Sequence, residues 1–285
     1  MSVRIKVDPA NPGQFFACCG LLELADRLSG SARGYFSPSG EEFVIDSAEG
    51  PKDGMAEVLR TELSSCSIQS TLTEAGTNSL RKLLNQKKSS RTPEDETEKQ
   101  RLSELWERER ICLSKPFDLW IDWWSDTRSG GSRFKTWAGK QLVIDIVRGM
   151  QAGIRGNHWK SVPTANWLCQ AVSDGSLPLY FDSDIGRQSA SLDVGFSTDA
   201  LEMRSGTRPM VELAAFAGLQ RFRPLPAEST ETFSYFQWTE PLPPMLAALA
   251  CSGYLPRVSV RPFEFRLLYR TKYLKGFLPA EPKGG

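Results

Sequence analysis

The stretch VRIKVDPANPGQFFACCGLLELADRL, residues 3–28, decides much of the fold. Apolar and charged side chains alternate over residues 3–7, and this period of two predicts a strand with one buried face. A helix start follows at once, with Asn11 as the N-cap, Pro12 at the first helical position and Gln14 at the third. The spacing predicts a capping box, in which side chains accept hydrogen bonds from amides that the first helical turn leaves without partners.

The helix that follows, residues 15–28, is apolar around most of its circumference. Its polar stripe of Glu23, Asp26 and Arg27 is narrow, so the helix must be covered on nearly every side. We expect it to be the central core helix. The segment 211–219, introduced by Pro209, is almost wholly apolar, and we expect it to form a second buried helix.

Strand, helix, strand, strand, helix and strand follow one another over about the first seventy residues, which is the order of a ferredoxin-like unit. The later strands of this unit are predicted at 33–37, 42–46 and 67–73, and its second helix at 53–63. The whole sequence predicts an α+β fold with mixed sheets packed on the two buried helices.

We divide the chain into three parts. Residues 1–84 form the α/β unit, residues 85–112 a charged linker and helix, and residues 113–285 an α+β domain that carries the basic segments. For this last part the sequence predicts strands at 115–124, 177–182, 191–197, 234–239 and 257–270, and helices at 134–152, 163–172 and 245–251. In the long strand at 257–270, the alternation of polar and apolar residues changes phase at Pro262, which indicates a bulge or a break.

Length and composition are ordinary for a soluble globular protein, with 285 residues, 40% hydrophobic and 24% charged. No apolar run approaches the roughly 18 residues of a membrane span, and the N-terminus has charges where a signal peptide has its apolar core. The six cysteines form no CxxC pair, which predicts reduced core thiols. We therefore expect a cytoplasmic protein without a membrane partner.

The net charge is only +1, but the charges are segregated along the chain. Residues 128–160 carry seven Lys and Arg against one Asp, and residues 253–285 carry seven against two Glu. Acidic residues gather instead at 41–62 and 94–109. Such segregation permits a basic face on a nearly neutral molecule.

Catalytic signals are weak. His158 is the only histidine, so any Ser-His-Asp or Cys-His system must use it, and no other sequence feature favours one. Asp118 and Asp122 share a face of the strand predicted at 115–124, where paired carboxylates can bind Mg²⁺ or act as acid and base. The cysteine spacing does not fit zinc, and the glycine-rich segments match no nucleotide-binding fingerprint. We expect no enzyme activity, no metal and no cofactor; a hydrolase that uses the two aspartates is the remaining enzymatic alternative.

The basic segments suit a nucleic-acid partner, and a scattered, solvated surface is the alternative interpretation. Residues 153–160, GIRGNHWK, combine glycine, Arg, Asn, Lys and an aromatic, which are types that approach phosphates and read or stack on bases. The short amides of Asn157 and Gln14 suit base edges in a minor groove. The candidate nucleic-acid-binding residues are Gln14, Lys135, Lys140, Arg148, Arg155, Asn157, His158, Lys160, Arg221, Arg223, Arg257, Arg261, Arg266, Arg270, Lys272 and Lys275.

Residues 7–28, VDPANPGQFFACCGLLELADRL, resemble the opening of a protein encoded in type I-U (also called I-G) CRISPR-Cas loci. Further similarity to it lies in FKTWAGKQ (134–141), SLDVGFS (191–197) and RPMVELAAFAGLQRFRP (208–224). That family is thought to supply the large, Cas-eight-type subunit of a Cascade surveillance complex.

The resemblance implies a non-catalytic subunit that recognises the PAM in double-stranded target DNA and helps to recruit the nuclease-helicase in antiviral defence. Its other implied partners are CRISPR RNA and the backbone and RNA-processing subunits of Cascade. Large subunits commonly end in a helical bundle, whereas residues 233–277 here predict strands. A RAMP-type RNA-binding backbone subunit therefore stays open as a second interpretation, and a protein-docking scaffold without nucleic-acid contact as a third.

Overall fold

The computed structural model describes residues 2–48, 54–108, 110–122, 142–173, 178–188, 206–227, 229, 231–270 and 273–284. Its helices are α1 (Pro12–Ser29), α2 (Met55–Ser65), α3 (Glu74–Asn85), α4 (Pro93–Glu107), α5 (Val143–Arg155), α6 (Ser183–Gln188), α8 (Pro209–Gly218) and α9 (Pro244–Cys251), with short 3₁₀ turns η1 (Lys88–Ser90), η2 (Asn157–Ser161) and η3 (Thr164–Asn166). Its strands are β1 (Ser2–Lys6), β2 (Ala32–Phe36), β3 (Glu42–Ser47), β4 (Ile68–Ser70), β5 (Ile111–Leu113), β6 (Leu119–Ile121), β7 (Leu225–Pro226), β8 (Thr232–Trp238), β9 (Ser259–Arg270), β10 (Tyr273–Phe277) and β11 (Glu281–Pro282).

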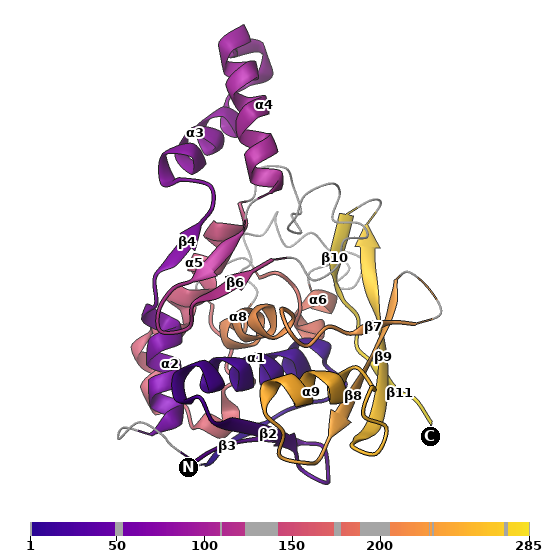
Figure 1. Cartoon of the computed structure of the whole chain (residues 1–285). Coiled ribbons are helices and arrows are strands. Elements are labelled where there is room, and N and C mark those ends of the chain that lie inside the picture. The colour runs from indigo at the N-terminus through magenta and orange to yellow at the C-terminus, as the bar shows by residue number, and fades with distance from the viewer. Residues whose placement is uncertain are drawn as a thin grey trace.

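The predicted α+β fold is confirmed (Figure 1). Strands pair in the orders β1-β3-β2, β4-β5-β6 and β10-β9-β8-β7, with β11 added to β9, and every pair among the described residues is antiparallel. The helices α1 and α8 lie together in the middle of the molecule, between these sheets. None of the described helices has both the length and the apolar character needed to cross a membrane.

The N-terminus of α1 is capped much as its sequence predicts. The side chain of Asn11 accepts a hydrogen bond from the Gln14 amide at 3.3 Å, and Pro12 stands in the first turn. The capping box is incomplete, because the Gln14 side chain accepts from the amide of Asp8 at 2.9 Å instead of returning to Asn11. Gly30 ends the helix with a φ of 70°, a left-handed conformation that glycine adopts without a steric penalty.

Both predicted core helices are buried, α1 from Pro12 to Ala25 and α8 over its whole length. They cross where Gly20 meets the backbone of Ala214, and where Gly218 meets the backbone of Phe16 and Gly20. A methyl group at either glycine would overlap main-chain atoms of the partner helix. Because neither position carries a side chain, the two backbones approach closely and bury the apolar residues that flank the crossing.

The ferredoxin-like unit is not confirmed. Strand β3 pairs with both β1 and β2, which is the arrangement of the first three strands in such a unit. The fourth strand, β4, leaves this sheet and pairs with β5. The division of the chain into residues 1–84, 85–112 and 113–285 stays a prediction. Contacts between α1 and α8 and between β4 and β5 join these parts.

Three predicted elements of the second half are wrong. Of the strand predicted at 115–124, β6 is the strand among the described residues 115–122, and residues 115–117 form a turn that includes a cis peptide bond before Pro116. Of the helix predicted at 163–172, the short turn η3 is formed. Trp167 and Leu168, which follow it, are buried in the core. In the strand predicted at 177–182, the described residues are irregular. The segments 191–197 and 134–141 lie outside the described residues.

Residues 178–182 are irregular, with a φ of 62° at Tyr180, and the side chain of Glu212 binds their amides. Its carboxylate, fully buried in the first turn of α8, accepts hydrogen bonds from the amides of Leu179, Phe181 and Asp182 at 2.9–3.3 Å. The amides that a neighbouring strand would satisfy are thus bound by a side chain. Asp182, also buried, accepts in turn from the side chain of Asn11 at 2.7 Å, and this contact ties the segment to the start of α1.

The strand-rich C-terminal part agrees with the sequence. Strand β8 pairs with β9 along its length, and the register shifts between Gln237 and Trp238, leaving Val260 as an extra residue on β9. This is a β-bulge close to Pro262, where the sequence predicted a bulge or a break. The sheet packs on α1 through rings such as Phe15, whose centroid lies 4.2 Å from that of Tyr235.

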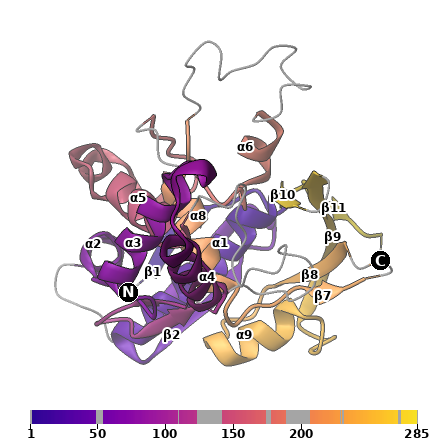
Figure 2. The same cartoon turned by 90° about the horizontal axis from the view of Figure 1, so that it is seen from above.

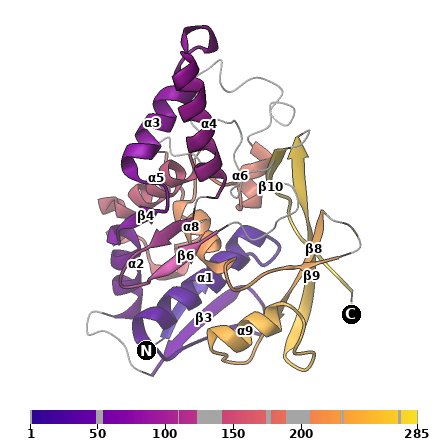
Figure 3. The same ribbon diagram turned by 45° about the horizontal axis from the view of Figure 1, so that its top comes forward.

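The helices α3 and α4 form a hairpin that extends from the rest of the molecule (Figures 1 and 3). A capping box between Thr92 and Asp95 starts α4, which is the charged helix predicted within residues 85–112. All six cysteines are free thiols, and all except Cys169 are buried, in agreement with the predicted core thiols.

Candidate nucleic-acid interface

Helix α5 carries basic side chains on an exposed stripe. Ile146, Val147 and Ile154 are buried, and the helix packs against α2 and α8. Arg148 and Arg155 are seven residues apart, which is close to two helical turns, and both are exposed. The amphipathic pattern of this segment therefore fixes two guanidinium groups on the same outward-facing side.

Arg81 of α3 joins this stripe through an ion pair with α5. Its guanidinium donates to both oxygens of Asp145 at 2.8 Å and to the side-chain oxygen of Asn78 at 2.8 Å. Asp145 is thereby neutralised. Arg148, one turn further along α5, makes no hydrogen bond or ion pair with any residue that the structure describes. Its positive charge is available to a ligand.

Arg155 has a structural role as well as an exposed charge. Its guanidinium donates twice to the carbonyl oxygen of Ser64, at 3.1 and 3.0 Å, at the C-terminal end of α2. A cation in this place is favoured by the carbonyls that a helix end leaves without partners. The side chain of Gln151 supports the same end, since it donates to the carbonyl of Cys66 at 2.7 Å.

The turn η2 follows α5 directly and carries two exposed residues, His158 and Lys160. Its aromatic residue does not serve as a base-stacking surface, which corrects the interpretation of the GIRGNHWK segment. Trp159 is 1% exposed, and its indole N–H donates to the carbonyl of Gly153 at 2.7 Å. Trp159 therefore anchors the turn on α5 and holds its two polar neighbours toward solvent. We call Arg81, Arg148, Arg155, His158 and Lys160 the α5 basic surface.

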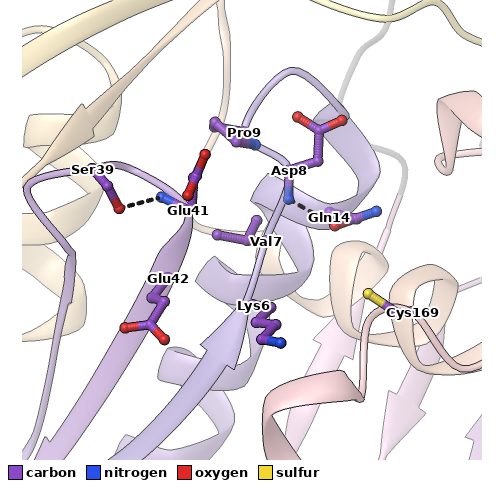
Figure 4. A pocket seen from close by; sticks show the side chains of 9 residues that line it. All are labelled: Lys6, Val7, Asp8, Pro9, Gln14, Ser39, Glu41, Glu42 and Cys169. Carbon is purple, nitrogen blue, oxygen red and sulfur yellow. Dashed lines mark hydrogen bonds between the residues drawn. The ribbon is translucent and has the colours of Figure 1, made fainter.

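Gln14 lies in a different environment. Its side chain is 5% exposed and lines a pocket of about 630 Å³ together with Asp8, Glu41 and Glu42 (Figure 4). Lys6 is the one cation among the residues that line this pocket. Three carboxylates repel a phosphate backbone, so the surroundings of Gln14 disfavour its predicted contact with nucleic acid.

Arg221 is bound to the core helix. It donates to both carboxylate oxygens of Glu23, which also accepts from Arg27 at 2.8 Å. Burial raises the pKa of the Glu23 carboxyl, but the hydrogen bonds and charges of these two arginines outweigh burial and hold the pKa below its ordinary value. Arg221 therefore balances a carboxylate that is almost fully buried in α1, while its neighbour Arg223 is exposed.

The basic residues of β9 and of the turn before it are only partly available. Arg257 and Arg266 are exposed. Arg261 donates to the carbonyl oxygens of Pro38 and Ser39, and so ties β9 to the turn between β2 and β3. The remaining candidates cannot be placed: Lys135, Lys140 and Lys272 lie outside the described residues, and the side chains of Asn157, Arg270 and Lys275 are not described.

The described parts of the basic segments lie apart. Helix α5 lies beside α2, whereas β9 lies in the C-terminal sheet, and Figures 1 and 2 place α5 and β9 on opposite sides of the α1–α8 pair. Arg221 is directed to α1 between them. The structure thus keeps Arg148 and Arg155 on one side of α5 and separates them from the described arginines of the C-terminal sheet.

Two cations that sequence reasoning missed contribute to the surfaces. Arg81 lies in a helix without a basic run, and only the ion pair with Asp145 connects it to α5. Arg110 lies over the ring of Trp120, 5.5 Å from its centroid, and Trp120 is 44% exposed. In the strand predicted at 115–124, alternation puts Trp120 on the same face as Asp118 and Asp122, and this polar face was the available signal.

The two aspartates of the enzymatic alternative do not share a strand face. Asp118 lies in the turn before β6 with a φ of 47°, and its carbonyl accepts from Arg27. Asp122 follows the strand, and its carboxylate lies 3.8 Å from Arg110. Within the described part of the chain, no three His, Cys, Asp or Glu side chains are grouped so as to hold a metal ion.

Comparisons with family models, with curated proteins and with solved structures give no match for this chain.

Proposed function

We propose that this chain is a non-catalytic subunit of a CRISPR RNA-guided DNA surveillance complex of the Cascade type, which acts in the cytoplasm in antiviral defence. In this role it contributes to recognition of the PAM in duplex DNA and to recruitment of the nuclease-helicase. The resemblance of residues 7–28, 134–141, 191–197 and 208–224 to proteins of type I-U loci supports the assignment.

The observation that carries the nucleic-acid part of the proposal is the α5 basic surface. Arg148 and Arg155 lie on one exposed side of α5, Arg81 of α3 pairs with Asp145 of the same helix, and Arg148 has no partner among the described residues. Phosphate contacts from such cations fix the register of a protein on a duplex without reading its sequence. Base recognition then falls to nearby polar groups, of which Asn157, at the start of η2, is the sequence candidate.

The buried carboxylates of the described residues have structural roles, which is compatible with a subunit that performs no chemistry. Glu23, Asp182 and Glu212 are each buried, and each accepts hydrogen bonds that hold elements of the fold together. Catalytic carboxylates need access to a substrate. The hydrogen bonds of these three carboxylates instead join α1, α8 and residues 178–182 to one another.

An exposed apolar surface on α9 favours a protein-docking function beside nucleic-acid binding. It consists of Met245, Leu246, Leu249, Tyr254 and Val260, of which Met245 and Tyr254 are 68% and 65% exposed. Arg223 and Arg257 flank it: the carbonyl of Arg223 accepts from Ser252 at the end of α9, and Arg257 follows in the next turn. This combination fits a partner subunit that presents apolar side chains within an acidic rim.

The test is co-expression of a tagged chain with the genes that flank it. We expect the chain to purify with partner subunits and with RNA that carries CRISPR repeat sequence. A chain that elutes alone, while its partners assemble with RNA and bind target duplex, would contradict the proposal. Omission of the chain separates the interpretations: loss of duplex binding with RNA retained indicates the large subunit, and release of RNA indicates a backbone subunit.

A further inference from the structure

The exposed apolar surface on α9 holds most of the large apolar side chains that the described part of the chain leaves in solvent. Five of those seven side chains lie there, and the other two, Leu105 and Trp120, lie on α4 and β6. Single apolar residues are normal on the surface of a monomer, whereas a contiguous group marks a place where another molecule binds. The concentration on one surface therefore points to a partner.

Helix α9 turns its small side chains inward and its large ones outward. Ala247, Ala250 and Cys251 are buried where the helix packs on β8, β2 and α1. Met245 and Leu249 are exposed on the opposite side. A helix that only covered the core would bury its largest apolar side chains, because their burial stabilises the fold most. The inverted pattern indicates a second apolar contact on the outer side of α9.

Tyr254 and Val260 extend this surface beyond the helix. The amide of Tyr254 donates to the carbonyl of Leu249 at 2.9 Å, so the chain turns directly at the end of α9. The β-bulge leaves Val260 as an extra residue on β9, and a bulge takes a side chain out of the regular alternation. The hydroxyl of Ser259 donates to the carbonyl of Ala250 at 2.8 Å and holds the start of β9 against α9. The surface is thus a fixed part of the fold.

The exposed charges at the two ends of α9 have opposite signs. Arg223 and Arg257 are exposed at its C-terminal end, and their side chains make no hydrogen bond or ion pair with any residue that the structure describes. Glu240 is exposed four residues before the helix begins. A partner therefore meets two positive charges at one end of the surface and a negative charge at the other. Charge complementarity assigns carboxylates to the part of the partner that faces the two arginines.

We propose that a helix of a partner subunit packs antiparallel to α9 on this surface, with apolar side chains along one face and Asp or Glu in its first turn. A helix suits the surface because the outer side of α9 presents side chains and no strand edge for an extended segment to pair with. Acidic residues are favoured in the first turn of a helix, and antiparallel packing brings that turn to Arg223 and Arg257. The inference rests on the proposed function for the source of the partner, a subunit encoded beside this chain.

A second copy of this chain is a less complementary occupant. Each copy would bring the same excess of positive charge to the contact, Arg223 and Arg257 against Glu240. Like charges across an interface disfavour association. An acidic partner removes this excess.

Co-expression of the tagged full chain with the genes that flank it tests the inference. Leu246→Ser combined with Leu249→Ser changes two side chains of the surface that are 43% and 41% exposed. Leu105→Ser, at a leucine that is 46% exposed on α4, is the matched control. We expect the double variant to recover about tenfold less of one partner protein, the usual effect of losing central interface side chains, and the control to recover as much as wild type. Both should keep the wild-type thermal midpoint, because the changed side chains are exposed.

A second pair of variants tests the charges. Arg223→Glu combined with Arg257→Glu should lower recovery of the same partner, whereas Lys87→Glu combined with Lys88→Glu, at exposed positions between α3 and α4, should not. In Arg223→Lys, a carbodiimide should link the new amine to a carboxylate in the first turn of a partner helix. A link to a carboxylate in the last turn of the partner helix would contradict the antiparallel orientation.

The outcomes distinguish this surface from the wider function. If wild type and Leu246→Ser/Leu249→Ser recover partner protein and CRISPR RNA alike, the docking inference is overturned and the proposed function stays intact. A partner that wild type recovers without RNA and the double variant loses supports the docking surface and counts against the proposed function. Recovery of no partner by wild type overturns both. Dimers of the free wild-type chain that the double variant does not form would show that a second copy covers the surface, and would also overturn the inference.

Discussion

At the scale of single residues, the two glycines at the α1–α8 crossing determine how closely the core helices pack. A Cβ atom added to Gly20 would overlap the carbonyl group of Ala214. We expect Gly20→Ala to lower the free energy of unfolding by about 3 kcal/mol, the upper part of the range for overpacking, since main-chain atoms cannot move aside as a side chain can. Urea unfolding measures the difference.

The matched control for this variant is Gly206→Ala. The nearest atom to a Cβ added there is the Cβ of Ala171 at 3.5 Å, an ordinary contact distance. This variant should unfold close to the wild-type midpoint. Equal stability of Gly20→Ala and Gly206→Ala would show that the helices do not cross at the distance described.

Glu23 predicts a dependence of stability on pH. Its pKa in the folded protein lies below the ordinary value because Arg221 and Arg27 outweigh the effect of burial. The carboxylate therefore stabilises the fold above its unfolded pKa of about 4.3, and this contribution is lost as the pH falls through the lower folded value. We expect the free energy of unfolding to decline more steeply below pH ~4.3 in wild type than in Glu23→Gln. Parallel declines in the two proteins would refute the role given to this ion pair.

Single residues also show where sequence reasoning reaches its limit. Asn11 and Gly30 were identified as caps because capping depends on residues close in the sequence. Trp159 and Gln14 were assigned to nucleic acid from residue type alone, yet one donates to the carbonyl of Gly153 and the other lies among carboxylates. Residue type does not reveal whether a side chain points inward, since that depends on tertiary contacts.

At the scale of elements, Glu212 replaces a strand partner for residues 178–182. We expect Glu212→Gln to speed amide hydrogen exchange at Leu179, Phe181 and Asp182, because an amide side chain offers one acceptor oxygen and turns its NH₂ group toward the remaining donors. Glu240→Gln, at an exposed position, is the control and should exchange as wild type. Unchanged exchange at the three amides in Glu212→Gln would contradict this account.

Elements with strong local signals were predictable, and those shaped by distant partners were not. Helices α1, α4 and α8 follow from apolar periodicity, caps and charge. The strand predicted at 177–182 failed because its amides bind a carboxylate about thirty positions later. The strand predicted at 67–73 is present as β4, but it pairs with β5 and not with the first sheet. The alternation of apolar and polar residues does not tell which strand is its partner.

At the scale of the whole molecule, the arrangement separates two kinds of surface. The α5 basic surface and the exposed apolar surface on α9 lie on different sides of the core helices (Figures 1 and 2). The sequence identified the basic segments and their charge, but a count of charges does not tell which segments share a face. A subunit that binds nucleic acid on one side and a protein partner on the other fits this separation.

The central claim is that the α5 basic surface contacts nucleic-acid phosphates. The most direct test is the slope of log Kd against log salt concentration for a duplex DNA, measured by fluorescence anisotropy. Arg148→Gln combined with Lys160→Gln should reduce the magnitude of the slope by about 1.8, since each phosphate contact contributes ~0.9. Arg33→Gln combined with Arg101→Gln, two exposed cations outside this surface, should leave the slope unchanged. A wild-type slope in the Arg148→Gln/Lys160→Gln protein, or no salt-dependent binding by the wild-type chain, would contradict the claim.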